Sequence, residues 1–130
     1  MPRSLRAYHF PMTRLVIKIT SGVEALERCN QGWTVATMAI ASGVDVSVWL
    51  AGDAVLFAVP GYAETVTLEG AQSFSDAVRT VLDEGSLTAC TQCLGRRKLT
   101  PADLIEGVRV GGAAGFVEEV LAPDAKPLVY

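Results

Sequence analysis

The chain has 130 residues, half of them apolar, and a formal net charge of −3. This length fits one domain, which buries roughly two-thirds of its unfolded surface and needs no disulfides to hold a core. The mildly acidic balance argues against sequence-independent binding of nucleic acid, which rests on neutralising phosphates. No apolar stretch approaches the ~20 residues that span a bilayer, so no membrane-spanning segment is expected.

The N-terminal residues 1–13 carry Arg3 and Arg6 without a long apolar run behind them, which is unlike a secretory signal. We expect a leader, or an arm that packs on a neighbour, followed by one domain over residues 14–130. Three cysteines, an odd number in a chain without a secretory signal, argue against a disulfide scaffold. The expected location is therefore the reducing cytoplasm.

The first half of the chain alternates between strand and helix patterns. Residues 15–20 are β-branched and nearly all apolar, which predicts a strand buried on both faces. Residues 24–42 repeat apolar side chains every three or four positions, which predicts a helix that ends before Gly43. A second strand is expected over 44–50 and a short helix over 54–58. Residues 65–68 fit either a short strand or an extended loop.

The second half continues the alternation. Residues 73–84 predict a helix with a serine N-cap, and residues 87–89 predict a brief strand that leads directly into Cys90. Residues 100–103 begin with a hydroxyl, a proline and, three residues on, an acid, which is typical of a helix start. A short strand over 108–110, a helix over 113–121 and a last strand over 128–130 complete the prediction.

Strands that alternate with helices predict right-handed crossovers and a mainly parallel sheet with helices on both faces. In an open parallel sheet, ligands bind beyond the carboxyl ends of the strands. We therefore expect a pocket between the loops at that edge. These loops contain Ser21, Gly22, Gly52, Asp53, Gly111 and Gly112, together with the run from Cys90 to Cys93. Asp53 also fits a helix N-cap.

Cys90 is the reactive side chain that the strand order places at this edge. If a helical turn begins there, its free backbone N–H groups would stabilise a thiolate. Cys93, one turn on, could reach Cys90 or point into the core. Cys29 lies on the apolar stripe of the first helix and is expected to behave as a small core residue. Arg96 and Arg97 could add positive potential, but so small a basic cluster usually forms a solvated face.

Three segments form a pattern that covers about Arg14 to Tyr130. The first runs from the strand at residue 15 to Ala51-Gly52-Asp53-Ala54-Val55. The second is Leu87-Thr88-Ala89-Cys90 with Leu94-Gly95-Arg96-Arg97 behind it, and the third runs from Thr100-Pro101-Ala102-Asp103 to Gly111-Gly112-Ala113. In this order and spacing they resemble the DsrE/DsrF-like family, which includes TusD-like sulfur-relay subunits and small proteins often labelled predicted peroxiredoxins.

The resemblance implies a three-layer α/β/α fold, with a mainly parallel sheet of about five strands, that assembles into homo-oligomers, either trimers or hexamers. In the sulfur-relay members the cysteine after the fourth strand accepts sulfur as a persulfide and hands it on, and Cys90 matches that position. Cys93 matches a second cysteine of many small members that the relay subunits do not require. Sulfur donor and acceptor proteins are the implied partners, and no cofactor is implied.

Three functions stay open. The first is a sulfur carrier or sulfurtransferase-like protein that uses Cys90. The second is a thiol–disulfide or peroxide-reactive protein in which Cys90 attacks and Cys93 resolves. The third is a non-enzymatic oligomeric binding module or a metal site between subunits, because a C-x-x-C pair supplies half of a four-ligand zinc site and Cys29 and His9 are poorly placed to complete it. The resemblance favours the first, whereas the residues alone leave the first two nearly level.

Overall fold

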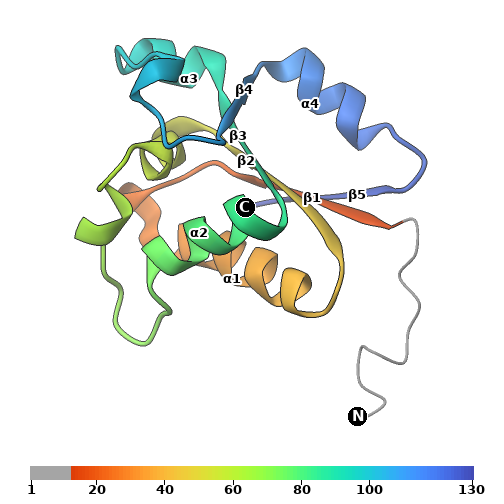
Figure 1. Ribbon diagram of the computed structural model, residues 1–130, viewed down its shortest axis with the longest axis horizontal. Coiled ribbons are helices and arrows are strands. Elements are labelled where there is room, and N and C mark those ends of the chain that lie inside the picture. The colour runs from red at the N-terminus through yellow and green to blue at the C-terminus, as the bar shows by residue number, and fades with distance from the viewer. Residues whose placement is uncertain (1–12) are drawn as a thin grey trace.

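Five parallel strands form one sheet in the computed structural model, which describes residues 13–130. The strands are β1 (Arg14–Ile19), β2 (Asp45–Leu50), β3 (Ser86–Cys90), β4 (Arg109–Gly111) and β5 (Ala125–Val129). Their order in the sheet is β4-β3-β2-β1-β5, and every neighbouring pair is parallel. The chain therefore steps outward from β1 to β4 and then returns across the sheet to β5 (Figure 1).

Helices cover both faces of this sheet, which confirms the predicted three-layer α/β/α fold. Helices α1 (Leu26–Ala41) and α2 (Phe74–Glu84) pack against each other on one face. Helix α4 (Ala113–Val120) lies on the opposite face and carries the chain from β4 to β5 (Figure 1). The short helix α3 (Thr91–Arg96) follows β3 directly at the carboxyl edge of the sheet. No helix within residues 13–130 has the length and apolar character needed to cross a membrane.

The core lies between the sheet and the pair α1 and α2. Alternate residues of a strand point to opposite faces, and one set of strand side chains meets the helices in a fully buried cluster. This cluster includes Ile17, Ile19, Val48, Leu50, Trp33, Phe57 and Val81. Cys29 is also fully buried within it, as the apolar stripe of the helix predicts.

The other face of the sheet is more polar, and α4 is attached to it by one carboxylate. Glu119 accepts hydrogen bonds from Ser47 Oγ at 2.7 Å and from the indole N–H of Trp49 at 2.6 Å. The Arg14 guanidinium also donates to Glu119, at 3.3 Å. These contacts fix the register of α4 over β1 and β2, and α4 in turn forms one wall of the site described below.

Several local predictions need correction. Of the two possibilities left open for residues 65–68, the structure excludes the strand and shows the loop: residue 65 ends the 3-10 helix Ala63–Thr65, residues 66–68 belong to no helix or strand, and β3 pairs directly with β2. Cys90 therefore ends the third strand rather than the fourth. The short helix expected at 54–58 is a longer 3-10 helix, η3 (Gly52–Ala58). The helix start at Thr100 has its capping box, but the 3-10 helix Pro101–Asp103 ends at once.

The C-terminal strand is longer than predicted and includes Pro127. β5 lies at the edge of the sheet, where a missing backbone donor is tolerated. The predicted leader falls almost entirely on residues 1–12, outside the described residues, as does His9, so the boundary at residue 14 stays a prediction.

Candidate functional site

Cys90 lies where a strand becomes a helix. It is the last residue of β3 and the N-cap of α3, with φ −68° and ψ 124°. Its half-buried thiol lines a cavity of about 170 Å³ at the carboxyl edge of the sheet. The rest of the wall comes from the ends of β1, β2 and β4 and from the first turns of α3 and α4: Lys18, Trp49, Leu50, Ala51, Gln92, Cys93, Gly111, Gly112, Ala113 and Phe116.

The surroundings of Cys90 favour its thiolate. Partial burial acts to raise the pKa of the thiol, but hydrogen bonds from the backbone N–H and the thiol of Cys93 and from the backbone N–H of Gln92 lower it. The positive charge of Lys18 lowers it further, and the net result is a Cys90 pKa below the ordinary value. Because the thiolate is the nucleophile, Cys90 is prepared to attack an electrophilic sulfur.

Cys29 differs from Cys90 in this respect. Burial raises the pKa of its thiol to about 12. It therefore stays protonated at neutral pH and lies too deep in the core to meet a substrate. By its burial and its raised pKa, Cys29 is a structural cysteine, whereas Cys90 and Cys93 lie at the edge of the sheet.

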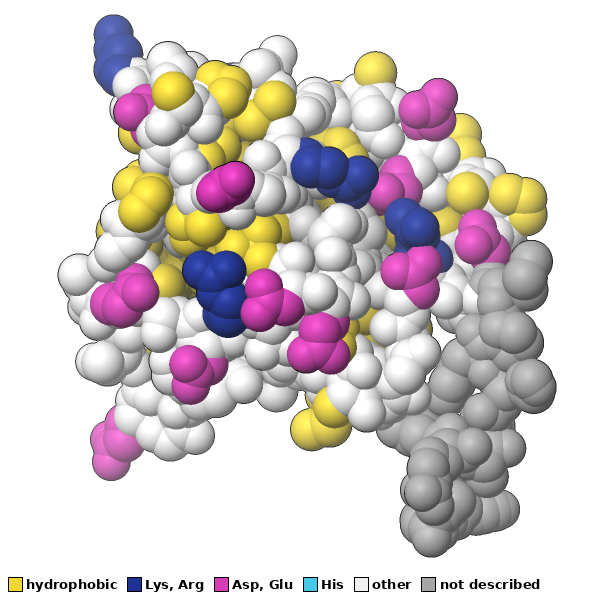
Figure 2. All heavy atoms as spheres, viewed as in Figure 1, with side chains coloured by type: hydrophobic (Ala, Val, Ile, Leu, Met, Phe, Trp, Pro, Cys, Tyr) yellow, Lys and Arg dark blue, Asp and Glu magenta, His cyan; other side chains and the backbone are white. Residues whose placement is uncertain are grey.

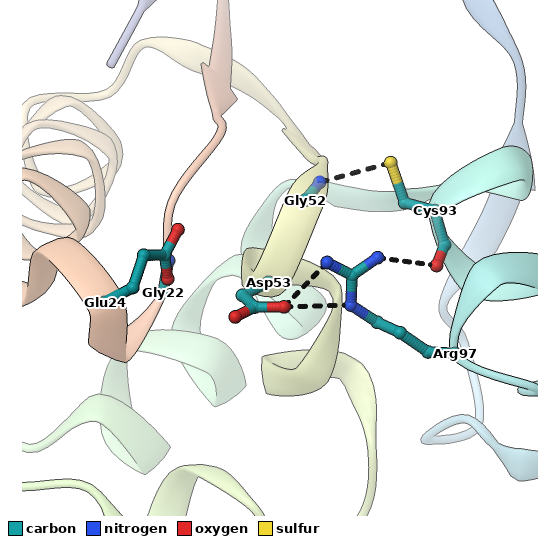
Figure 3. Close-up of polar contacts among 6 residues, drawn as sticks. All are labelled: Gly22, Glu24, Gly52, Asp53, Cys93 and Arg97. Atoms are coloured by element: carbon teal, nitrogen blue, oxygen red, sulfur yellow. Dashed lines mark hydrogen bonds and ion pairs between the residues drawn. The ribbon is translucent and has the colours of Figure 1, made fainter.

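Cys93 is buried beside Cys90 rather than pointing away from it. Its sulfur accepts a hydrogen bond from the backbone N–H of Gly52 at 3.1 Å (Figure 3). Its thiol hydrogen-bonds to Cys90 and helps to lower the Cys90 pKa. Gly52 has a φ of +57°, and a Cβ there would lie 2.6 Å from the carbonyl oxygen of Thr20. Both the conformation and the space at this position require glycine.

An ion pair behind the cysteines joins α3 to η3. The Arg97 side chain donates to Asp53 Oδ1 from Nη2 at 2.6 Å and from Nε at 2.9 Å (Figure 3). Its Nη1 also donates to the carbonyl oxygen of Cys93 at 2.9 Å. Arg97 is therefore not part of a solvated face, and Asp53 is not an N-cap, because Ala51 occupies the N-cap of η3.

The six predicted pocket residues divide into two groups. Gly111 and Gly112 line the cavity, whereas Ser21, Gly22, Gly52 and Asp53 lie outside its wall. The loop after β1 is closed by its own contacts: Ser21 Oγ donates to the Ala25 carbonyl oxygen and the Gly22 N–H donates to Glu24 (Figure 3). A Cβ on Gly22 would also lie 2.9 Å from the Asp53 carbonyl oxygen, so no space is left between these loops. A functional role for these four residues stays a prediction.

Three wall residues that were not predicted from the sequence form a connected group: Lys18, Phe116 and Trp49. The Lys18 ammonium lies 4.6 Å from the centre of the Phe116 ring. That ring meets Trp49 edge-on, with 5.4 Å between ring centres and 78° between planes. Gly111 leaves room for the Trp49 indole, because a Cβ there would lie 3.0 Å from its Cη2. The sequence carried one signal, which is a lysine inside an otherwise apolar strand.

The arrangement supplies a nucleophile, a second thiol within hydrogen-bond reach and one cation. Within residues 13–130, no group of three or more His, Cys, Asp and Glu side chains is placed to hold a metal ion. A metal site completed by a second subunit stays an untested alternative. The two thiols and the cation suit the transfer of a sulfur atom or exchange between thiol and disulfide.

Two solved structures are similar to this fold. The ychN protein from E. coli has 17% sequence identity and a TM-score of 0.75, and the match covers 91% of this chain and 99% of that one. The protein of unknown function MTH1491 from Methanobacterium thermoautotrophicum has 18% identity and a TM-score of 0.65, with the same coverage. At these identities the likeness shows the fold alone.

No curated protein matches the chain. A family match exists, however, and spans residues 13–125, so it includes every strand but the last and both cysteines of the cavity. The resemblance seen in the sequence is thereby confirmed, and the chain belongs to the DsrE/DsrF-like family.

Proposed function

We propose that this protein carries sulfane sulfur as a persulfide on Cys90. Membership of the DsrE/DsrF-like family suggests a sulfur-relay-type role. The observation that carries the proposal is the Cys90 thiol itself, which has a lowered pKa and lines a cavity at the carboxyl edge of the sheet. A relay cysteine needs both properties, since it must attack a donor as a thiolate and then present the bound sulfur to an acceptor.

The loading step needs no external oxidant or reductant. The Cys90 thiolate attacks the outer sulfur of a donor persulfide. A new S–S bond forms to Cys90 while the donor's S–S bond breaks, and the donor leaves as a thiolate with the bonding electron pair. Unloading repeats the exchange, with an acceptor thiolate attacking the outer sulfur of the Cys90 persulfide.

Cys93 offers a second way to unload. Its thiolate can attack the inner sulfur of the Cys90 persulfide, forming a Cys90–Cys93 disulfide and releasing sulfide. The two cysteines are oxidised and the sulfane sulfur is reduced, so a dithiol reductant must restore the pair. The hydrogen bond between the two thiols supports this route.

The proposal extends to the setting of the protein. Sulfur donor and acceptor proteins would be its partners, and homo-oligomers, trimers or hexamers, its assembled form. A reducing cytoplasm would keep Cys90 free between transfers.

The test is the mass of the intact protein after incubation with a persulfide donor. We expect a one-sulfur adduct on the reduced wild type, none on Cys90→Ala, and an unchanged adduct on Cys29→Ser. Cys93→Ser should hold the adduct longer, because the internal release route is lost. An adduct that survives in Cys90→Ala would exclude Cys90 as the carrier.

A second candidate function is thiol–disulfide or peroxide chemistry of the same pair, favoured by the contact between Cys93 and Cys90. Under mild oxidation with diamide, this candidate predicts loss of two hydrogens and a disulfide mapped to Cys90 and Cys93. If that disulfide forms readily and no donor leaves a sulfur on Cys90, the redox function replaces the carrier function.

A further inference from the structure

The wall of the Cys90 cavity carries a single cation and no acid. Lys18 is the one residue of this wall with a positively charged side chain, and neither Asp nor Glu lines the cavity. Among residues 13–130, no carboxylate lies within ion-pair distance of the Lys18 ammonium, while Arg14 and Arg97 are each paired. The positive charge at the cavity is therefore not neutralised by a neighbouring carboxylate.

The position of this charge is fixed. The Lys18 stem is half-buried in β1, and its ammonium is held over the face of Phe116, a cation–π contact that keeps the charge. Lys18 is also the charged side chain whose field reaches the Cys90 sulfur. The cation comes from β1 and the nucleophile from β3, the two strands on either side of β2, and both line the same small cavity.

Apart from Gln92 and the two cysteines, the remaining wall is apolar, and the space is small. Trp49, Leu50 and Phe116 provide most of its large side chains. The volume of about 170 Å³ corresponds to about five or six water molecules of ~30 Å³ each. A polarisable sulfur atom suits the apolar side, whereas a charged group suits the Lys18 end.

We propose that this cavity selects a small anionic sulfur donor, with Lys18 binding the charged end and Cys90 taking the sulfane sulfur. The inference rests on the proposed carrier function and names its donor class. Thiosulfate is the simplest molecule with this chemistry, since it joins a terminal sulfur to a sulfonate group. Without Lys18, a negatively charged donor would approach the thiolate with no cation in the cavity wall to offset their repulsion.

The transfer from thiosulfate balances without another reagent. The Cys90 thiolate attacks the terminal sulfur, a new S–S bond forms, and the S–S bond of thiosulfate breaks. Sulfite leaves with the electron pair of that bond, and its developing charge lies beside the Lys18 ammonium. The product is a Cys90 persulfide and one sulfite, and sulfite release is a second measure of the step.

The charge selectivity can be measured separately from sulfur transfer. In a Cys93→Ser background, Cys90 is titrated with an anionic and a cationic methanethiosulfonate reagent. We expect the ratio of the two rates, anionic over cationic, to fall about tenfold in Lys18→Gln. Lys18→Arg should keep the ratio. Lys126→Gln removes an exposed lysine of β5 outside the cavity wall, has the same net charge as Lys18→Gln, and should also keep it.

Sulfur transfer is then measured with thiosulfate on the wild type and on Lys18→Gln, by intact mass and sulfite release. The wild type should load Cys90 about ten times faster than Lys18→Gln. A rate ratio that Lys18→Gln leaves unchanged would overturn the anion site. If the ratio falls but Cys90 is loaded by neither thiosulfate, a small organic persulfide nor a protein-borne persulfide, the carrier function fails instead. Loading only from a protein-borne persulfide would keep the carrier function and overturn the small-anion donor.

Discussion

At Cys90, the lowered pKa has a direct kinetic consequence. Only the thiolate is alkylated at a useful rate, so the midpoint of the rate profile against pH follows the pKa. Burial raises this pKa, but the Cys93 and Gln92 hydrogen bonds and Lys18 bring it below the ordinary value. We expect alkylation of Cys90 by iodoacetamide to reach half its maximal rate at a lower pH than in the urea-unfolded chain.

The Lys18→Gln variant supplies the control for this profile. Loss of the ammonium removes one cause of the lowered pKa, so the midpoint should move to higher pH. Lys126→Gln should leave it in place. A native midpoint at or above that of the unfolded chain would show that burial outweighs the hydrogen bonds at this sulfur.

The site residues differ in how far the sequence could predict them. Cys90 could be predicted because its place follows from local patterns, a short apolar run that ends in a cysteine and is followed by a helix. Lys18 could not, because a strand that is apolar on both faces does not reveal which face meets the cavity. Trp49 and Phe116 come together only through the β1–β2 register and the position of α4. Arg97 and Asp53 are 44 residues apart, and no local pattern connects them.

At the scale of elements, helix α4 depends on Glu119 for its attachment to the sheet. Glu119→Ala would leave Ser47 Oγ and Trp49 Nε1 without their acceptor in an almost fully buried position. We expect a loss of about 2 kcal/mol in the free energy of unfolding, measured by urea denaturation. Glu119→Gln should cost less, since an amide oxygen still accepts one of these bonds.

The neighbouring Glu118 provides the matched control for α4. It is exposed and makes no side-chain hydrogen bond or ion pair within the described residues. Glu118→Ala should change the unfolding free energy by less than about 0.5 kcal/mol. Equal effects of the two alanine variants would contradict the attachment of α4 by Glu119.

Helix α1 approaches β1 closely at a glycine. A Cβ on Gly32 would lie 2.6 Å from Cγ1 of Ile19, a fully buried side chain with stiff β-branching. The overpacking of Gly32→Ala, typically about 1–3 kcal/mol, should exceed the ~1 kcal/mol that alanine gains in a helix. We expect a net loss of up to about 2 kcal/mol in the free energy of unfolding, measured by urea denaturation.

At Gly95 in α3, the same substitution to alanine is expected to change the stability in the opposite direction. A Cβ there meets nothing within 4 Å, and the residue is exposed. Gly95→Ala should therefore stabilise the chain by about 0.5–1 kcal/mol. If both alanine variants raised the stability, helix propensity rather than packing would govern α1.

For the molecule as a whole, the alternation of strands and helices was enough to predict a parallel sheet with helices on both faces. The prediction at residues 65–68 shows where that reasoning ends. Thr65-Val66-Thr67-Leu68 has the local preference of a strand, but β2 already has β1 and β3 as neighbours, so no sheet edge is left for it there. Strand pairing is decided by the arrangement of the whole chain, which a short segment does not contain.

One face of the molecule shows how its charged side chains are distributed. On the face shown in Figure 2, acidic and basic side chains are interspersed rather than gathered by sign. Neutralising the phosphates of a polyanion would need basic side chains gathered in one place, which this face does not show, and the absence of a nucleic-acid partner stays a prediction. Contacts with other proteins would rest on apolar surface instead.

Such apolar surface lies around α4 and the edge strand β5. Val117 is 49% exposed, Leu121 76% and Val129 63%. Val117 and Leu121 are four residues apart, so they share one side of the helical turn. We expect this surface to be buried between copies of the chain, where each large apolar side chain contributes about 1.5–3 kcal/mol. Leu121→Glu should therefore reduce the mass of the assembly in sedimentation equilibrium.

A substitution at Met38 tests whether the loss of assembly mass is specific to the apolar surface around α4 and β5. It is 62% exposed but lies on α1, which covers the opposite face of the sheet from α4. Met38→Glu adds the same charge to an equally exposed apolar position, and the assembly should keep its mass. A wild-type chain that sediments as a monomer would contradict the homo-oligomer. An unchanged mass in Leu121→Glu would place the contact elsewhere, because a glutamate disrupts an interface only where it must be desolvated. Loss of the assembly in Met38→Glu would show that the contact is not confined to the surface around α4.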